Sequence, residues 1–174
     1  MSLQQNVSTL LREPVGATRR YEVDADLLID DERHRVGGSA LLLRTKDGVL
    51  ATARLEGCLH QPCSRCLRDT ETPLRLVIED EFFARVDPLT GAKLPPPDDP
   101  EAFLIDAQHV IDLTDAVRQY WTTALPMQPL CQPGCCGLCS VCGADLNAGA
   151  CSCRPEDDSR WSALRQFAVR SEGS

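Results

Sequence analysis

Cysteines are crowded into a short stretch near the carboxyl end of the chain. Seven of the ten cysteines fall between residues 131 and 153. The centre of this stretch is Cys139-Ser-Val-Cys142-Gly143, in which two thiols stand two residues apart and a glycine follows. Thiols at this spacing are typical of tetrahedral zinc sites, because a tight turn then presents two sulfur ligands to one ion. The sequence therefore predicts that bound metal helps to order this part of the chain.

A disulfide framework is the main alternative for so many cysteines, and it requires an oxidising compartment. The first residues contain no basic segment followed by an apolar stretch, so no secretory signal is evident. No apolar run is long enough to cross a membrane. We therefore expect a cytoplasmic protein whose reduced thiols bind Zn²⁺. Iron–sulfur clusters also use four thiolates, but the ferredoxin spacings are absent.

Two Cys-x-x-Cys pairs occur in the sequence, and each supplies half of a four-thiolate site. The pair in the crowded stretch can be completed locally, which gives an expected site one formed by Cys139, Cys142, Cys151 and Cys153. The other pair needs partners from a distant part of the chain, which gives an expected site two formed by Cys63, Cys66, Cys131 and Cys135.

The spacing leaves other assignments open. Cys131 and Cys135 could take the place of the last two ligands of site one. Cys63 and Cys66 would then remain a reduced pair without metal, or His60 could substitute as a ligand beside them. A redox pair of the thioredoxin type is disfavoured, because it requires a strand-to-helix setting and this pair stands between two predicted strands.

Hydrophobic periodicity indicates strands through the first half of the chain. Apolar and polar residues alternate over 21–29, 49–59 and 74–79. Asp47-Gly48 separates two such runs and favours a hairpin. Later in the chain, apolar residues at helical spacing predict an amphipathic helix over 112–125, which Asp112 can cap and Pro126 ends.

Together these patterns predict an α+β fold, which consists of a mainly antiparallel β domain, one or two helices and a C-terminal zinc-binding module. Residues 1–86 are expected to form the antiparallel β region and 87–110 a linker rich in proline and acids. A helix at 111–126 would pack on the β region. Residues 127–174 would contain the cysteine-rich zinc module and a short final helix at 159–169.

The net charge of the chain is −8, and each four-thiolate zinc site would add two more negative charges. Such acidity disfavours general nucleic-acid binding, which depends on Lys and Arg. Residues 94–117 contain no Lys or Arg but six acids, which fits either a solvated loop or a docking strip for a basic partner. No catalytic motif, phosphate-binding loop or small-molecule site is evident, so an enzyme is not expected.

Several separated segments resemble those of one protein family, the YceD family of large ribosomal RNA subunit accumulation proteins. The resemblance lies in residues 6–16, in Cys63-Ser-Arg-Cys66-Leu, in Ile111-Asp-Leu-Thr-Asp with Ala124-Leu-Pro126, and in residues 136–147 followed by Cys151-Ser-Cys153. Order and spacing agree over nearly the whole chain. Cys58 and Cys136 fall where the pattern requires no cysteine, so neither is given a role.

The resemblance implies a non-enzymatic bacterial or plastid protein that supports accumulation of large-subunit rRNA. Genes of this family often neighbour a gene for a small, basic, zinc-binding ribosomal protein. The resemblance therefore implies, as partner, a large-subunit ribosomal protein or a pre-ribosomal particle, with any contact to rRNA indirect. A membrane or a small-molecule substrate is not implied.

Two other functions remain open from the sequence. One is direct rRNA binding through an arginine-rich face formed by Arg65, Arg68, Arg75, Arg154, Arg160 and Arg165. The other is a redox or zinc-sensing switch that uses the thiols of Cys63 and Cys66.

Overall fold

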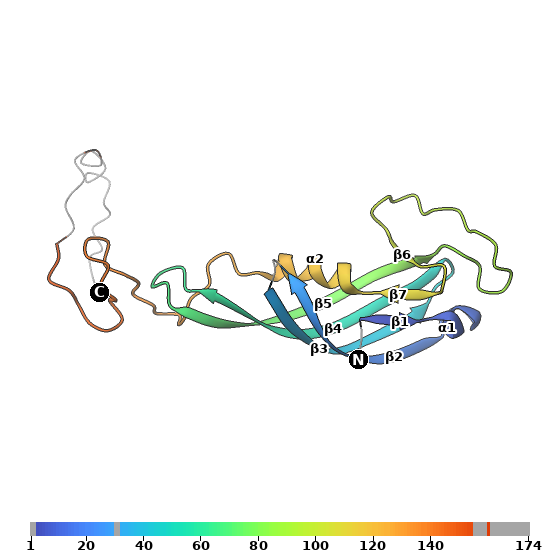
Figure 1. The fold of residues 1–174 in the computed structure, drawn as a ribbon, viewed down its shortest axis with the longest axis horizontal. Coiled ribbons are helices and arrows are strands. Elements are labelled where there is room, and N and C mark those ends of the chain that lie inside the picture. Colours follow the sequence, from blue (N-terminus) through green and yellow to red (C-terminus); the bar gives the residue numbers. More distant parts are fainter. Residues whose placement is uncertain (1–2, 30–31, 155–159, 161–174) are drawn as a thin grey trace, which may run out of the picture.

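The chain folds around a long, twisted β-sheet, shown in Figure 1. The structure is a computed structural model that describes residues 3–29, 32–154 and 160. The elements in chain order are β1 (Gln4–Asn6), α1 (Ser8–Arg12), β2 (Thr18–Ile29), β3 (Glu32–Arg44), β4 (Gly48–Pro62), β5 (Asp69–Ala84), β6 (Phe103–Ile105), β7 (Val110–Asp112) and α2 (Thr114–Ala124). Among the described residues, no helix has the length and apolar character needed to span a membrane.

The main sheet has five strands in the order β2-β3-β4-β5-β6. Its first four strands are antiparallel, and β6 joins β5 in parallel. Strands β1 and β7 form a separate antiparallel pair. The hairpin predicted at Asp47-Gly48 is present, since β3 ends at Arg44 and β4 begins at Gly48. The prediction of a mainly antiparallel fold with one or two helices is thereby confirmed.

Apolar residues alternate along the strands, so that one face of the sheet is buried. In β4 the side chains of Ala51, Ala53 and Leu55 are buried, whereas those of Arg54 and Glu56 are exposed. Buried side chains of α1, β7 and α2 complete the core on that side. The opposite face, which carries Arg54 and Glu56, is called the open face below.

Helix α2 is held on the sheet by Trp121, as the apolar stripe of this segment predicts. The Trp121 side chain is 1% exposed, and its ring centroid lies 4.9 Å from that of His34 in β3. Gly57 in β4 makes room for the ring, because a Cβ at this position would lie only 2.5 Å from Cζ3 of Trp121. Figure 1 shows α2 lying against the sheet beside β5.

Strands β4 and β5 continue beyond the rest of the sheet as a two-stranded ribbon. The pairing of β3 with β4 ends at Val36 opposite Gly57, but the pairing of β4 with β5 continues to Pro62 opposite Asp69. In Figure 1 this ribbon extends away from α1 and β1, and the chain that follows α2 returns along it to its tip. Residues 63–68 form that tip and contain the first Cys-x-x-Cys pair.

The structure adds detail that the sequence patterns did not indicate. Residues Ser8–Arg12, which were expected to lie in the β region, form helix α1. The range expected to be a linker, 87–110, contains strand β6 and the first residue of β7. Helix α2 begins at Thr114, whose amide donates a hydrogen bond to Oδ1 of Asp112 at 2.8 Å. The helix predicted at 159–169 lies outside the described residues.

Replacing Gly57 with alanine should destabilise the fold. The new methyl group would collide with the Trp121 ring, so we expect a loss of about 1–3 kcal/mol in the free energy of unfolding, measured by chemical denaturation. Gly134→Ala is the matched control, because a Cβ there meets no atom within 4 Å in the described part of the chain. Equal stability of the two variants would contradict the packing of Trp121 against β4.

Candidate metal centres

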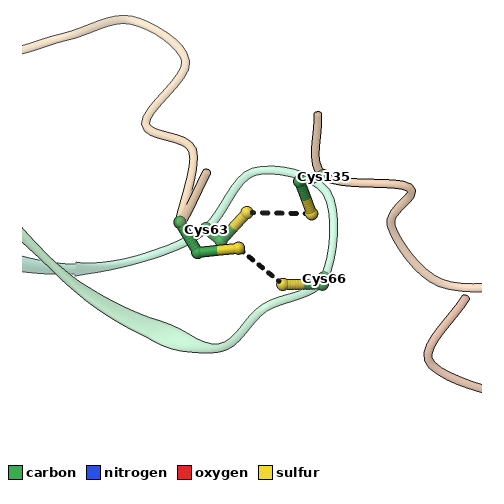
Figure 2. A group of neighbouring side chains, drawn as sticks. Cys63, Cys66 and Cys135 are labelled. Atoms are coloured by element: carbon green, nitrogen blue, oxygen red, sulfur yellow. Dashed lines mark hydrogen bonds between the residues drawn. The ribbon is translucent and has the colours of Figure 1, made fainter. Parts of the chain in front are cut away.

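The ribbon tip and the chain after α2 bring four thiols together. Cys63 and Cys66 lie in the turn between β4 and β5, and the amide of Ser64 donates to the carbonyl of Pro129 at 2.8 Å. This contact aligns the returning chain with the turn. The sulfur of Cys63 then lies 3.8 Å from that of Cys135. Figure 2 shows the Cys63, Cys66 and Cys135 side chains directed toward one another.

This first group consists of the four residues expected for site two, Cys63, Cys66, Cys131 and Cys135, whose sulfurs all lie within 4.8 Å of one another. A second group consists of the four residues expected for site one, Cys139, Cys142, Cys151 and Cys153, within the same limit. The structure thus places each expected set together and does not mix the two. Metal binding at either group remains a prediction.

Each group is built on the same local turn. In the ribbon tip, the amide of Cys63 donates to the carbonyl of Arg68 at 2.8 Å, and the amide of Leu67 donates to the carbonyl of Cys63 at 3.0 Å. In the second group, the amide of Cys139 donates to Ala144 at 2.8 Å, and the amide of Gly143 donates to Cys139 at 2.9 Å. The residue after the second cysteine is left-handed in both turns, with φ of 59° at Leu67 and 71° at Gly143.

The spacing of the sulfurs suits a tetrahedral ion. A Zn–S bond of about 2.3 Å implies sulfurs about 3.8 Å apart at the corners of a tetrahedron. In site two the Sγ atoms of Cys63 and Cys135 lie 3.8 Å apart, and those of Cys66 and Cys131 lie 3.6 Å apart. All ten cysteines are free thiols, so no disulfide competes for these sulfurs. The donor set and its geometry therefore fit Zn²⁺, which such residues would hold in a closed, structural site.

Backbone amides make one thiol in each turn easy to ionise. Amides of Cys66, Cys131 and Arg65 lower the pKa of Cys63 to about 6, and the Arg65 amide lies 3.5 Å from the sulfur. Amides of Cys142 and Val141 likewise lower the pKa of Cys139 to about 6. A thiolate is the form that binds a metal, so these turns prepare a first ligand at neutral pH.

Other thiols of the two groups resist ionisation. Burial, followed by the neighbouring thiol of Cys66, raises the pKa of Cys131 to about 12. The hydrogen bond with Cys142, followed by burial, raises the pKa of Cys153 to about 12. Sulfur atoms packed this closely cannot all carry negative charge without a cation between them. The two groups therefore combine a prepared thiolate with thiols whose ionisation requires a bound ion.

A polar network connects the two groups, and Asn147 is its centre. Asn147 lies in the loop between Cys142 and Cys151, yet its Nδ2 donates to the sulfur of Cys135 at 3.4 Å. Its Nδ2 also donates to Oδ1 of Asp145 at 2.7 Å. Asn147 therefore fixes a sulfur of site two from within the segment that carries site one, as outer-shell partners of metal ligands do.

Asp145 and two arginines extend this network to the ribbon tip. Arg68 donates to Oδ2 of Asp145 at 3.0 Å, and Arg65 donates through NH1 to the carbonyl of Cys135 at 2.8 Å. The amide of Leu138 also donates to the carbonyl of Arg65 at 3.1 Å. Neither Asp145 nor Asn147 belongs to a metal-ligand pattern in the sequence. The sequence feature that could have identified these two residues is the Gly-Ala-Asp-Leu-Asn segment, which is part of the family resemblance.

The two groups differ in their exposure to solvent. In site two, Cys63 is 0% and Cys135 is 1% exposed. In site one, Cys142 is exposed and the other three cysteines are partly exposed. His60, the alternative ligand, is 66% exposed and belongs to neither group. Cys58 and Cys136 also lie outside both groups.

Single Cys→Ser substitutions should show that the two groups bind metal independently. We expect two Zn²⁺ per chain in the unchanged protein and one in either Cys142→Ser or Cys63→Ser, because each variant loses one ligand of one group. Zinc should also leave the unchanged protein in two phases, with the exposed site one first. Elemental analysis and release to a chromogenic chelator measure both quantities. Loss of both ions from Cys142→Ser would contradict independent sites.

Removing Asn147 should weaken site two selectively. In the Cys142→Ser background, where only site two remains intact, we expect Asn147→Ala to lower zinc affinity by about 10- to 100-fold because Cys135 loses its polar partner. Competition with a chelator measures the affinity. Gln132→Ala is the matched control, since the Gln132 side chain donates to Oδ1 of Asn147 at 3.3 Å and forms no hydrogen bond with a sulfur of the described residues. Unchanged affinity in Asn147→Ala would contradict this role.

The sequence matches one protein-family profile and several curated proteins. Residues 51–168 match the family profile described as "Large ribosomal RNA subunit accumulation protein YceD". An uncharacterized protein of Mycobacterium tuberculosis is 29% identical over 118 residues, which cover 68% of this chain and 55% of the relative. A protein of Mycobacterium bovis gives the same values. The chain thus spans about half the length of these curated relatives.

A plant protein matches over a shorter region. The chloroplastic large ribosomal RNA subunit accumulation protein YCED homolog 1 of Zea mays is 33% identical over 60 residues, which cover 34% of this chain and 20% of the plant protein. No solved structure matches the chain. The family profile covers both metal-site turns and more than half of the sequence, and on that evidence the chain belongs to the YceD family.

Proposed function

We propose that this protein is a non-enzymatic factor that supports accumulation of large-subunit rRNA by binding a basic ribosomal protein or a precursor particle. Zn²⁺ in the two four-thiolate sites would keep the ribbon tip and the C-terminal segment in one arrangement. The description of the family, which names rRNA accumulation, supports the process. The net charge of −8 supports a basic partner.

A protein partner is favoured over RNA because arginine side chains near the metal sites already interact with other residues of this chain. Arg65 donates to the carbonyl of Cys135, Arg68 pairs with Asp145, and Arg75 lies 3.5 Å from Glu56. These are three members of the face considered for direct rRNA binding. Because their guanidinium groups already have partners inside the protein, contact with phosphate would require those interactions to be exchanged.

The acid-rich stretch at 94–117 contributes less to this proposal than its composition suggests. Asp99, Asp106 and Asp112 each accept hydrogen bonds from nearby backbone amides. Asp115 pairs with Arg118 at 3.2 Å within α2. These carboxylates therefore stabilise turns and the start of a helix, as short polar side chains commonly do. The proposal rests on the overall charge of the protein and not on this stretch as a docking strip.

The arrangement of the thiols supports a structural use of the metal. Four sulfur ligands would fill the coordination of a Zn²⁺ ion and leave no open position for water or substrate. A redox switch at Cys63 and Cys66 is less well supported, because an oxidant would have to reach two buried sulfurs. The metal sites are therefore proposed to maintain a shape that the partner recognises.

Affinity capture tests the partner. We expect the tagged full-length protein to recover large-subunit ribosomal proteins from a bacterial lysate, and to retain them after nuclease treatment, because the contact is made to protein. Cys63→Ser should recover less, since site two orders the ribbon tip. Recovery that disappears with nuclease would support the rRNA alternative, and recovery of unrelated enzymes alone would contradict the proposal.

A further inference from the structure

Strand β2 is an edge of the main sheet along its whole length. It extends from Thr18 to Ile29 and pairs with β3 on one side. The sheet order places β2 at one end, and no strand in the described part of the chain pairs with its outer side. An edge of this length displays unpaired backbone groups and is a template for a further strand unless something covers it.

Hydrogen bonds at the two ends of β2 show which residues face outward. Ala17 accepts from the amide of Arg44 at 2.8 Å, so Ala17 and the odd-numbered residues that follow it direct their backbone groups toward β3. The even-numbered residues therefore direct theirs outward. At the far end, the carbonyl of Leu28 accepts from Nε of Arg118 at 3.3 Å, which agrees with this assignment.

The side chains of the outward-facing residues carry a self-complementary charge pattern. Arg20 and Glu22 are exposed on the open face, and neither forms an ion pair with a described residue. The basic residue comes first along the strand and the acidic residue follows two positions later. When two such strands run antiparallel, each Arg20 lies opposite the Glu22 of the other strand.

We propose that the outer edge of β2 pairs antiparallel with β2 of a second copy of this chain, which joins two five-stranded sheets across a two-fold axis at Tyr21. This register places Arg20 opposite the partner's Glu22 twice, and places the two Tyr21 rings next to each other as a cross-strand aromatic pair. Tyr21 is partly buried against the core in each copy. A two-fold arrangement of this kind is closed, so it stops at a dimer.

Other antiparallel registers are less favourable because they oppose like charges. Two β2 strands form hydrogen bonds only when even-numbered residues of one face even-numbered residues of the other. The possible registers therefore differ from one another by steps of two residues. A shift in one direction places Arg20 opposite Arg20. A shift in the other places Glu22 opposite Glu22, although it also places Arg20 opposite Asp24, which already pairs with Arg35 within the chain. A further shift places Arg20 opposite Asp26 but Glu22 opposite Asp24, so that two repulsive pairs offset the two attractive ones. The register centred on Tyr21 therefore has the best electrostatic match.

Reversal of the charges tests the inference. We expect the unchanged protein to form a concentration-dependent species of twice the 19.1 kDa chain mass, measured by sedimentation velocity. Arg20→Glu should raise the dissociation constant by roughly tenfold or more, because two attractive pairs become repulsive. The double variant Arg20→Glu/Glu22→Arg should restore the dimer. Arg54→Glu is the matched control, because it makes the same charge change on the open face of the central strand β4.

Two results would overturn the inference. The first is a species of 19.1 kDa at all concentrations up to high micromolar. The second is a dimer that Arg20→Glu leaves intact or that the double variant fails to restore. Circular dichroism of each variant checks that the sheet remains folded, so a loss of association cannot be mistaken for a loss of structure.

Discussion

The approach of Cys131 and Cys135 to Cys63 and Cys66 determines where the segment that follows α2 is placed. A segment with little regular structure follows α2, and its attachment to the ribbon is made by thiols, a few backbone hydrogen bonds and two arginines. These contacts close a loop of about seventy residues between the ribbon tip and the returning chain, and closing a long loop is entropically unfavourable. A metal ion shared by both sides would offset that loss, as it does in other small metal-dependent modules.

Two kinds of order are therefore combined in one chain. The five-stranded sheet has its own apolar core, formed by one face of the strands together with α1, β7 and α2. The cysteine-rich segment has only a small apolar cluster, in which Leu130 and Leu138 pack against buried thiols. A cluster of that size cannot hold a fold by itself, so polar contacts around Asn147 carry much of the arrangement.

Local patterns predicted the parts of this structure that depend on local chemistry. Asp47-Gly48 predicted the hairpin. The spacing of the cysteines left several assignments open, and the two sets of four that were expected are the ones that the structure brings together. The left-handed residue of the first turn could not be read in the same way, because it is Leu67 and not glycine. Strands β1, β6 and β7 could not be predicted, because each has three residues, too few to carry a periodic signal, and each pairs with a strand distant in sequence.

The ribbon formed by the ends of β4 and β5 has a consequence for how this molecule can engage a larger assembly. Beyond Gly57 the two strands continue for five residue pairs without support from β3. At about 3.3 Å per residue, the paired thiols of the tip stand some 17 Å from the last three-stranded row. A partner that contacts the tip and the cysteine-rich segment bound to it would therefore be held away from the main sheet, and the number of strand residues would set that distance.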